Sequence, residues 1–192
     1  MHAPDSLPAP RRPPLAAHWR FLLLAAGLYA LWLISYEGFV RADGRLDAWL
    51  SLGIARASTG LLQAVGFKAS LTPDLALVNM DGLPAVVVGA PCDGLALYAL
   101  FAGFVVAFPG PWRPKLWFIP AGIAVIFLLN VVRVAALAVN HHYARQSVNF
   151  NHHYTFTFVV YTCIGLLWMW WARHYGPPRP IVDTADTAAE HA

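Results

Sequence analysis

The amino-acid sequence predicts an all-α membrane protein with about four transmembrane helices, an outer amphipathic helix and a short β-hairpin. Of the 192 residues, 58% are hydrophobic and 12% are charged, whereas roughly 25% of an ordinary soluble domain is charged. Four apolar segments also approach the roughly 20 residues that cross the hydrocarbon core of a bilayer. They are residues 19–36, 92–108, 116–139 and 153–171. We therefore expect the lipid bilayer, and no nucleic acid, as a partner.

Both ends of the chain have the composition of disordered cytoplasmic tails. Residues 1–16 are rich in Pro, Arg and Ala without apolar periodicity, and residues 176–192 follow the last apolar segment. The stretch after Leu22 could pass for a signal peptide, but Ser35-Tyr36-Glu37 puts bulky residues where a cleavage site would lie. The sequence therefore predicts a retained anchor and one membrane-embedded domain over residues 17–175.

Basic residues near the helix ends predict the orientation, because Lys and Arg are enriched on the cytoplasmic side. They flank the first segment, occupy the turn at 109–115 and follow the last segment: Arg11, Arg12, Arg20, Arg113, Lys115, Arg173 and Arg179. Both termini and this turn are therefore expected in the cytoplasm, with residues 37–91 outside. The chain would be a multi-pass protein of the cell (inner) membrane.

The outer segment contains two predicted elements. Residues 46–69 mix apolar side chains with Ser, Thr, Arg and Gln, which favours an amphipathic helix on the outer interface over a fifth span. Residues 75–88, LALVNMDGLPAVVV, form two apolar runs around Asp81-Gly82, which is the pattern of a β-hairpin. The second run leads directly to Cys92.

Cys92 is placed at the predicted start of the second transmembrane helix. Helix N-termini stabilise negative charge, and the thiolate is the nucleophilic form of cysteine. Cys92 is therefore a candidate nucleophile, although Asp93 beside it would oppose thiolate formation. The alternative is that Cys92 is a small buried hydrophobic residue.

Arg133 is the second candidate. It lies 17 residues beyond Leu116, or roughly 26 Å along a helix, which puts it near the outer interface at the level of Cys92. Ionisable residues within a membrane are functional candidates by default; the alternative is that the side chain snorkels to the headgroups. Asn130, one turn earlier, shares its helix face and can hydrogen-bond to it.

Histidine pairs supply the third candidate. Residues 140–143, Asn-His-His-Tyr, are echoed by residues 151–154, and His153 opens the last apolar segment. An imidazole can take a thiol proton and return it to a leaving amine. Alternatively, imidazoles on one side of the membrane could bind a transition metal or haem, through His141, His142, His152 and His153.

These motifs resemble those of the exosortase and archaeosortase family of membrane cysteine transpeptidases. The family has a cysteine before a small residue and glycine, an N-x-x-R motif on a later helix, and a histidine opening another helix. Here they stand as Cys92-Asp93-Gly94, as Asn130 and Arg133, and as His153, within residues 84–172. The resemblance implies catalytic roles for Cys92, Arg133 and His153.

The chain departs from the family pattern at two positions and in length. Asp93 stands where serine is frequent after the cysteine, and Thr157 where a glycine is frequent four residues after the histidine. Many family members also have about eight spans. His152 is a rival catalytic histidine, but His153 places Thr157 and Tyr161 at the family's small and aromatic positions.

The resemblance implies that substrates are proteins whose C-terminal tail carries a short motif, a hydrophobic span and a basic cluster. Cys92 would attack near the motif at the outer face, without a metal or organic cofactor. We expect the three side chains to meet within roughly 8 Å of each other, and no disulfide between Cys92 and Cys163. A non-catalytic assembly or transport subunit is the remaining alternative. The sequence leaves open the motif, the acceptor and the oligomeric state.

Overall fold

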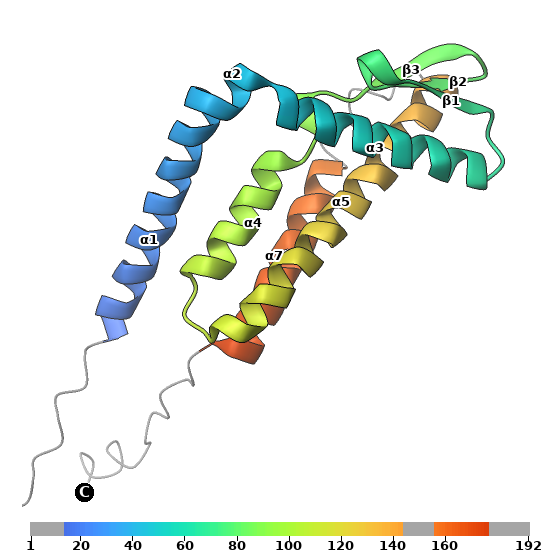
Figure 1. Cartoon of the computed structure of the whole chain (residues 1–192). Coiled ribbons are helices and arrows are strands. Elements are labelled where there is room, and N and C mark those ends of the chain that lie inside the picture. Colours follow the sequence, from blue (N-terminus) through green and yellow to red (C-terminus); the bar gives the residue numbers. More distant parts are fainter. Residues whose placement is uncertain (1–13, 144–155, 177–192) are drawn as a thin grey trace, which may run out of the picture.

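The structure is a computed structural model, which describes residues 14–143 and 156–176. It is mostly helical and includes one small β-sheet (Figure 1). The predicted tails lie outside the described residues, apart from 14–16 and Gly176. The description therefore covers nearly all of the predicted domain except the segment before the last helix.

Four long helices run alongside one another: α1 (Pro14–Ser35), α4 (Leu95–Ala107), α5 (Trp112–Tyr143) and α7 (Phe156–Tyr175). Among the described helices, two are long and apolar enough to cross a membrane. These are residues 19–43, which include most of α1 and its continuation, and α5. Helix α4 has 13 residues, which is shorter than a typical span. The four-span arrangement therefore stays a prediction.

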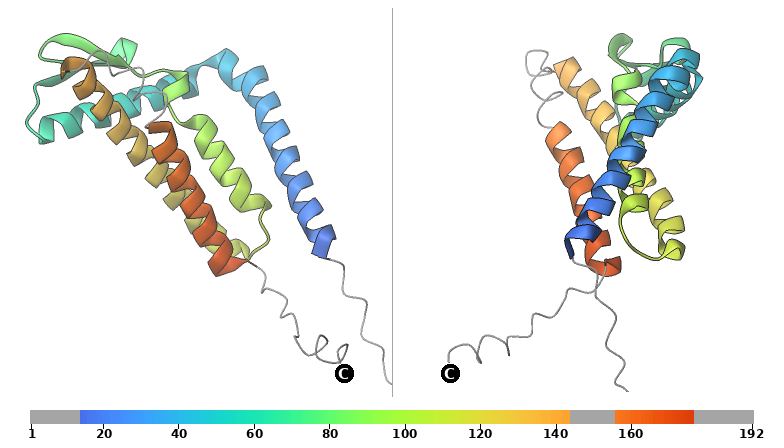
Figure 2. Two further views of the ribbon diagram at one scale, coloured as in Figure 1. Left: turned by 180° about the vertical axis from the view of Figure 1, so that it is seen from behind. Right: turned by 90° about the vertical axis from the view of Figure 1, so that its left-hand side faces the viewer.

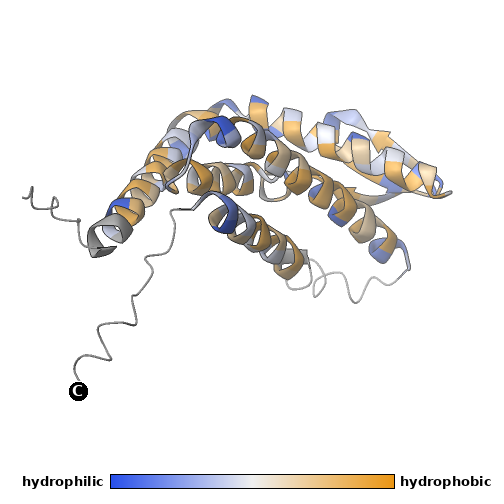
Figure 3. Cartoon of the chain, turned by 90° about the horizontal axis from the view of Figure 1, so that it is seen from below, coloured by the Kyte–Doolittle hydropathy of each residue, from blue (hydrophilic) through white to orange (hydrophobic). Residues whose placement is uncertain are grey.

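These helices consist largely of apolar residues (Figure 3), and many of their large side chains are exposed. Large side chains such as Leu23, Leu128 and Phe158 are 70%, 60% and 74% exposed. An exposed apolar surface of this extent is costly in water, and it marks a protein that contacts lipid or other apolar partners.

Helix α1 continues through a π-helical segment (Tyr36–Val40) and the short α2 (Arg41–Asp43) into α3 (Arg45–Ala64). Gly44 makes the turn between α2 and α3 with a left-handed φ of 64°. Helix α3 runs across the ends of α4 and α5, at the same end as the sheet (Figures 1 and 2). This confirms the predicted amphipathic helix, although it ends at Ala64 because a strand follows.

One face of α3 is buried, with the spacing of an amphipathic helix. Its members are Asp47, Ser51, Ile54, Ala55, Ser58, Thr59 and Leu62. The Ser58 hydroxyl donates to the Val131 carbonyl of α5 at 3.1 Å. This bond gives the Ser58 hydroxyl a partner where it is fully buried, and it joins α3 to α5.

The sheet consists of β1 (Ala69–Thr72), β2 (Leu77–Met80) and β3 (Leu83–Val87), antiparallel in that order. The predicted hairpin is confirmed as β2 and β3. Asp81 and Gly82 both have positive φ, as a tight two-residue turn between twisted strands requires. Strand β1 was not predicted, because four residues are too few to show an alternating pattern.

Two apolar clusters hold the elements together. The upper cluster joins α3, the sheet and α5, with Cys92 packed against it; its buried members include Ile54, Leu62, Val78, Met80, Val131 and Val134. The lower cluster joins α4, α5 and α7; its buried members include Phe101, Val105, Phe118, Ile126, Ile164 and Trp171.

Lys115 closes the turn between α4 and α5. It is 3% exposed, and its ammonium donates to the carbonyls of Val106 and Phe108 at 2.9 and 2.8 Å. The last carbonyls of a helix lack partners within that helix, so this lysine caps α4. The turn lies beside the end of α7, since Gly110 approaches the Tyr175 carbonyl, and opposite to the end that carries α3 and the sheet (Figure 1).

Gly122 allows α4 and α5 to pack closely, because a Cβ there would overlap the Phe101 ring. Gly122→Ala should therefore destabilise the fold by about 1–3 kcal/mol through overpacking, measured as a lower melting temperature in detergent. The matched control is Gly103→Ala on α4, where a Cβ meets nothing within 4 Å. Equal melting temperatures for the two variants would contradict this packing.

Candidate functional site

Cys92 ends a 3₁₀ turn (Ala90–Cys92), in which its amide donates to the Gly89 carbonyl at 2.7 Å. Helix α4 begins only at Leu95, so the predicted helix start at Cys92 is wrong by three residues. The reason is Gly94, whose left-handed φ of 78° separates the turn from the helix. Since the helix dipole acts mainly within the first turn, Cys92 gains less from it than the sequence suggested.

Arg133 of α5 lies beside this turn. Its Nη2 atom is 4.0 Å from the Cys92 sulfur, and both residues are half-buried. The structure therefore brings together two of the three predicted site residues, which are 41 positions apart in the chain. A cation next to a sulfur stabilises negative charge on it and is typical of reactive cysteines.

Asn130 lies on α5 about one helical turn before Arg133. It is 1% exposed, and its amide nitrogen lies against Gly94, as does the hydroxyl of Tyr98. Neither amide atom of Asn130 makes a well-formed hydrogen bond within the described residues. The structure therefore does not show the expected bond to Arg133, and Asn130 instead packs against the start of α4.

Asp93 is 1% exposed, and its Oδ1 accepts a hydrogen bond from the Leu95 amide at 2.9 Å. Burial raises the pKa of this carboxyl to about 7; the Leu95 amide opposes the rise, and the neighbouring Asp47 carboxyl adds to it. Sequence reasoning treated Asp93 only as an obstacle to the thiolate. The structure makes it a buried group that fixes the backbone directly after Cys92.

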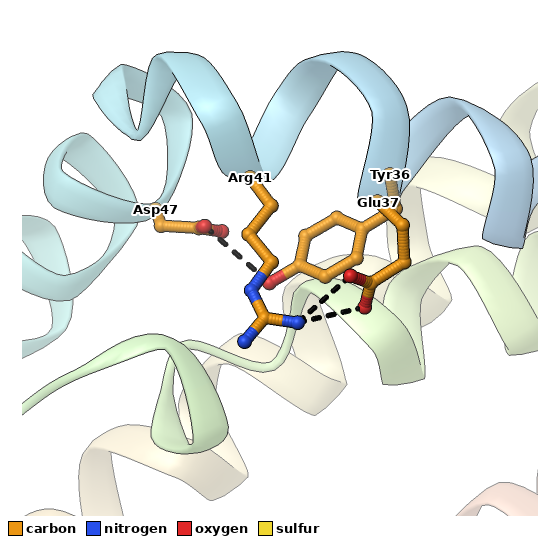
Figure 4. Close-up of polar contacts among 4 residues, drawn as sticks. All are labelled: Tyr36, Glu37, Arg41 and Asp47. Atoms are coloured by element: carbon orange, nitrogen blue, oxygen red, sulfur yellow. Dashed lines mark hydrogen bonds and ion pairs between the residues drawn. The ribbon is translucent and has the colours of Figure 1, made fainter.

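Asp47 comes from the first turn of α3, and sequence reasoning missed it. It is 9% exposed and accepts a hydrogen bond from the Tyr36 hydroxyl at 3.4 Å (Figure 4). Nearby, the Arg41 guanidinium binds the Glu37 carboxylate at 2.7 Å (Figure 4). Its spacing from Ser51 and Ile54 places it on the buried face of α3, but this spacing does not show that α3 folds onto the cysteine turn.

A pocket of about 360 Å³ opens beside Asp93, between α1, α4 and α7. Its wall includes Tyr36, Glu37, Ala90, Asp93, Leu97 and Tyr161. The wall is therefore mostly apolar, with a few polar and aromatic groups next to the cysteine turn.

The two candidate histidines, His153 and His152, lie outside the described residues, so the third part of the predicted site is not tested. Of the earlier pair, His142 contacts the Asp81 carboxylate at 3.1 Å and joins α5 to the hairpin turn. Within residues 14–143 and 156–176, no three His, Cys, Asp or Glu side chains gather as metal ligands would.

A sequence model of transmembrane exosortases matches residues 16–170. The match runs from α1 into α7, so it includes every element that positions Cys92 and Arg133. This chain belongs to the transmembrane exosortase family. No solved structure and no protein of curated function is significantly similar to it. The family and the apolar helices together make the exosortase a membrane protein.

Cys92 and Cys163 of this exosortase are not joined by a disulfide in the structure. Cys163 lies within α7, whereas Cys92 precedes α4. The second thiol therefore serves as an internal control for experiments on the first.

Gly94 fixes the approach of the cysteine turn to α5. Gly94→Ala should destabilise the fold by about 1–2 kcal/mol, because a residue with a Cβ is strained in a left-handed backbone. The new Cβ would also overlap the Asn130 amide. Gly66→Ala is the matched control, because Gly66 also has positive φ but open space around it. We expect a lower melting temperature and slower maleimide labelling of Cys92 for Gly94→Ala than for Gly66→Ala; equal values would argue against a fixed turn.

Proposed function

We propose that this exosortase is a membrane-embedded cysteine protease or transpeptidase that cleaves C-terminal sorting signals of exported proteins. The observation that carries the proposal is the 4.0 Å approach of Arg133 Nη2 to the Cys92 sulfur. Both residues also lie within the segment, residues 16–170, that matches the sequence model of transmembrane exosortases. A half-buried arginine whose charge is directed at a thiol is costly to maintain in a membrane protein, which argues for a role in chemistry.

In the proposed mechanism, the Cys92 thiolate attacks the scissile carbonyl and forms a tetrahedral intermediate. Arg133 stabilises the oxyanion or positions the substrate backbone through its planar set of donors. The C–N bond then breaks, and His153, with His152 as the alternative, protonates the leaving amine. The resulting thioester reacts with an acceptor nucleophile or with water, which releases the thiolate.

The reaction is proposed for the outer face of the membrane. Cys92 packs against the cluster formed by α3, the sheet and α5. The turn between α4 and α5 lies at the opposite end of the molecule from α3 and the sheet (Figure 1). Arg113 and Lys115 follow that turn at the start of α5, and basic residues near helix ends favour the cytoplasmic side. Four spans, formed by α1, α4, α5 and α7, would then connect a cytoplasmic start with an outer site.

The proposed substrates are proteins that carry a short motif, a hydrophobic span and a basic tail at their C-terminus. A substrate span in the bilayer would bring its outer end to the depth of the cysteine turn, because both are positioned by the same membrane interface. The pocket beside Asp93 supplies polar and aromatic groups at this level.

Cys92→Ala should abolish processing of such a partner while the exosortase still accumulates, since a thiol-to-methyl change at a half-buried position costs little packing. Cys163→Ala should leave processing intact, because that thiol lies within α7. The measurement is the ratio of full-length to processed partner in membranes at matched expression. Normal processing by Cys92→Ala would end the cysteine mechanism.

Arg133→Lys distinguishes a catalytic arginine from one that only reaches toward headgroups. Lysine keeps the charge but loses the planar donors, so processing should fall by about 100-fold, as when one oxyanion donor is removed. Arg56→Lys, on α3, serves as the control at an exposed arginine. Processing by Arg133→Lys at the rate of the control would contradict the assigned role.

A further inference from the structure

Two buried carboxyl groups meet directly behind the cysteine turn. Asp93 is 1% exposed and Asp47 is 9% exposed. Tyr36 lies beside both, because its hydroxyl donates to Asp47 and its side chain shares a pocket wall with Asp93. The Asp47 carboxyl is also near enough to Asp93 to raise its pKa. They come from different parts of the chain, since Asp47 opens α3 and Asp93 lies between Cys92 and α4. Contact between α3 and the turn at 90–92 brings them together.

The hydrogen-bond inventory of this pair lacks a donor. Asp93 Oδ1 accepts from the Leu95 amide, and Asp47 Oδ2 accepts from Tyr36. The remaining oxygens, Asp93 Oδ2 and Asp47 Oδ1, are fully buried and have no donor among the described residues. Ionised carboxylates only accept hydrogen bonds, so a proton on either group is needed to join these two oxygens.

We propose that Asp47 and Asp93 form a carboxyl pair that shares one proton, positions the turn carrying Cys92 and limits the negative charge beside its sulfur. The single charge that remains is compatible with burial, because Asp47 lies in the first turn of α3, where the helix dipole favours negative charge, and Asp93 accepts a hydrogen bond from the first amide of α4. Two charges so close together would repel each other strongly.

Other groups also face the pair. Tyr36, Glu37 and Arg41 approach it from the segment that follows α1, Tyr98 approaches from α4, and Arg133 lies beyond Cys92 on α5. Arg41 is paired with Glu37 and exposed. The charge next to the sulfur is therefore controlled mainly by the protonation of the pair and by Arg133.

The direction of the pH effect follows from the shared proton. Burial and, to a smaller extent, the Asp47 carboxyl raise the pKa of Asp93 to about 7, against the opposing hydrogen bond from the Leu95 amide. The pair therefore gains a further negative charge as the pH rises through neutrality. The second charge opposes thiolate formation at Cys92. The alkylation rate of Cys92 should therefore depend on whether the neighbouring pair holds its proton.

The first measurement uses the unmodified protein in lipid nanodiscs. Infrared difference spectra should contain the C=O stretch of a protonated carboxylic acid that disappears near neutral pH, well above the ordinary range for aspartate. Asp93→Asn should remove this band, and the exposed Asp43→Asn should keep it. Absence of a band that titrates near pH 7 in the wild type would overturn the proposal without any variant.

The second measurement reads the effect on the sulfur. In a Cys163→Ala background, the iodoacetamide alkylation rate of Cys92 is followed against pH for the wild type, Asp47→Asn, Asp93→Asn and Asp43→Asn. Asparagine keeps the size and the hydrogen-bonding groups of aspartate, so both pair variants should fold. Each variant removes one negative charge, so we expect the midpoint of the alkylation rate against pH to move down by roughly one pH unit, with a simple one-proton curve. Asp43→Asn should match the wild type.

Coincident curves for wild type and both pair variants would refute the proposed control of charge at Cys92, and a purely structural pair would give that result. The importance of the pair rests on the proposed peptidase function. The alkylation test does not depend on that function, because alkylation needs no substrate. Failure of partner processing by Cys92→Ala would refute the peptidase function and leave the alkylation result standing.

Discussion

The crossing of α3 over α5 is the constraint on which the rest of the structure depends. The buried face of α3 packs on Val131 and Val134, and Ser58 gives a hydrogen bond to the α5 backbone. The sheet packs into the same cluster, so the strand that leads to Cys92 has a fixed end point. Because Arg133 follows Val131 on α5, the crossing also determines which arginine reaches the thiol.

The long apolar helices, the amphipathic helix and the hairpin could be predicted because each has a repeating pattern or a marked turn. The pairing of Cys92 with Arg133 could be predicted only as a shared depth, from helix length. The start of α4 was misplaced because the apolar composition continues through Cys92, while the backbone is interrupted by a left-handed glycine that hydropathy does not detect. Strand β1 is too short to carry a pattern of its own.

Asp47 shows why the site was only partly predicted. An aspartate in the first turn of a surface helix is ordinary, and its importance appears only when α3 is folded onto the cysteine turn. Asp93 departs from the serine frequent in the family at this position, and by itself it argued against a reactive thiol. Paired with Asp47, Asp93 is less unfavourable to a thiolate, because one shared proton leaves the pair with a single negative charge instead of two.

Lys115 has a consequence for how the chain enters the membrane. In the proposed orientation, with this turn in the cytoplasm, its ammonium would be a hydrated cation before α4 and α5 pack, and it would help to retain the turn on that side. In the folded protein the same ammonium is enclosed by the carbonyls of Val106 and Phe108 and no longer faces the headgroups. One residue thus contributes first to topology and then to folding, and an arginine, with its bulky planar group, could replace it only in the first of these roles.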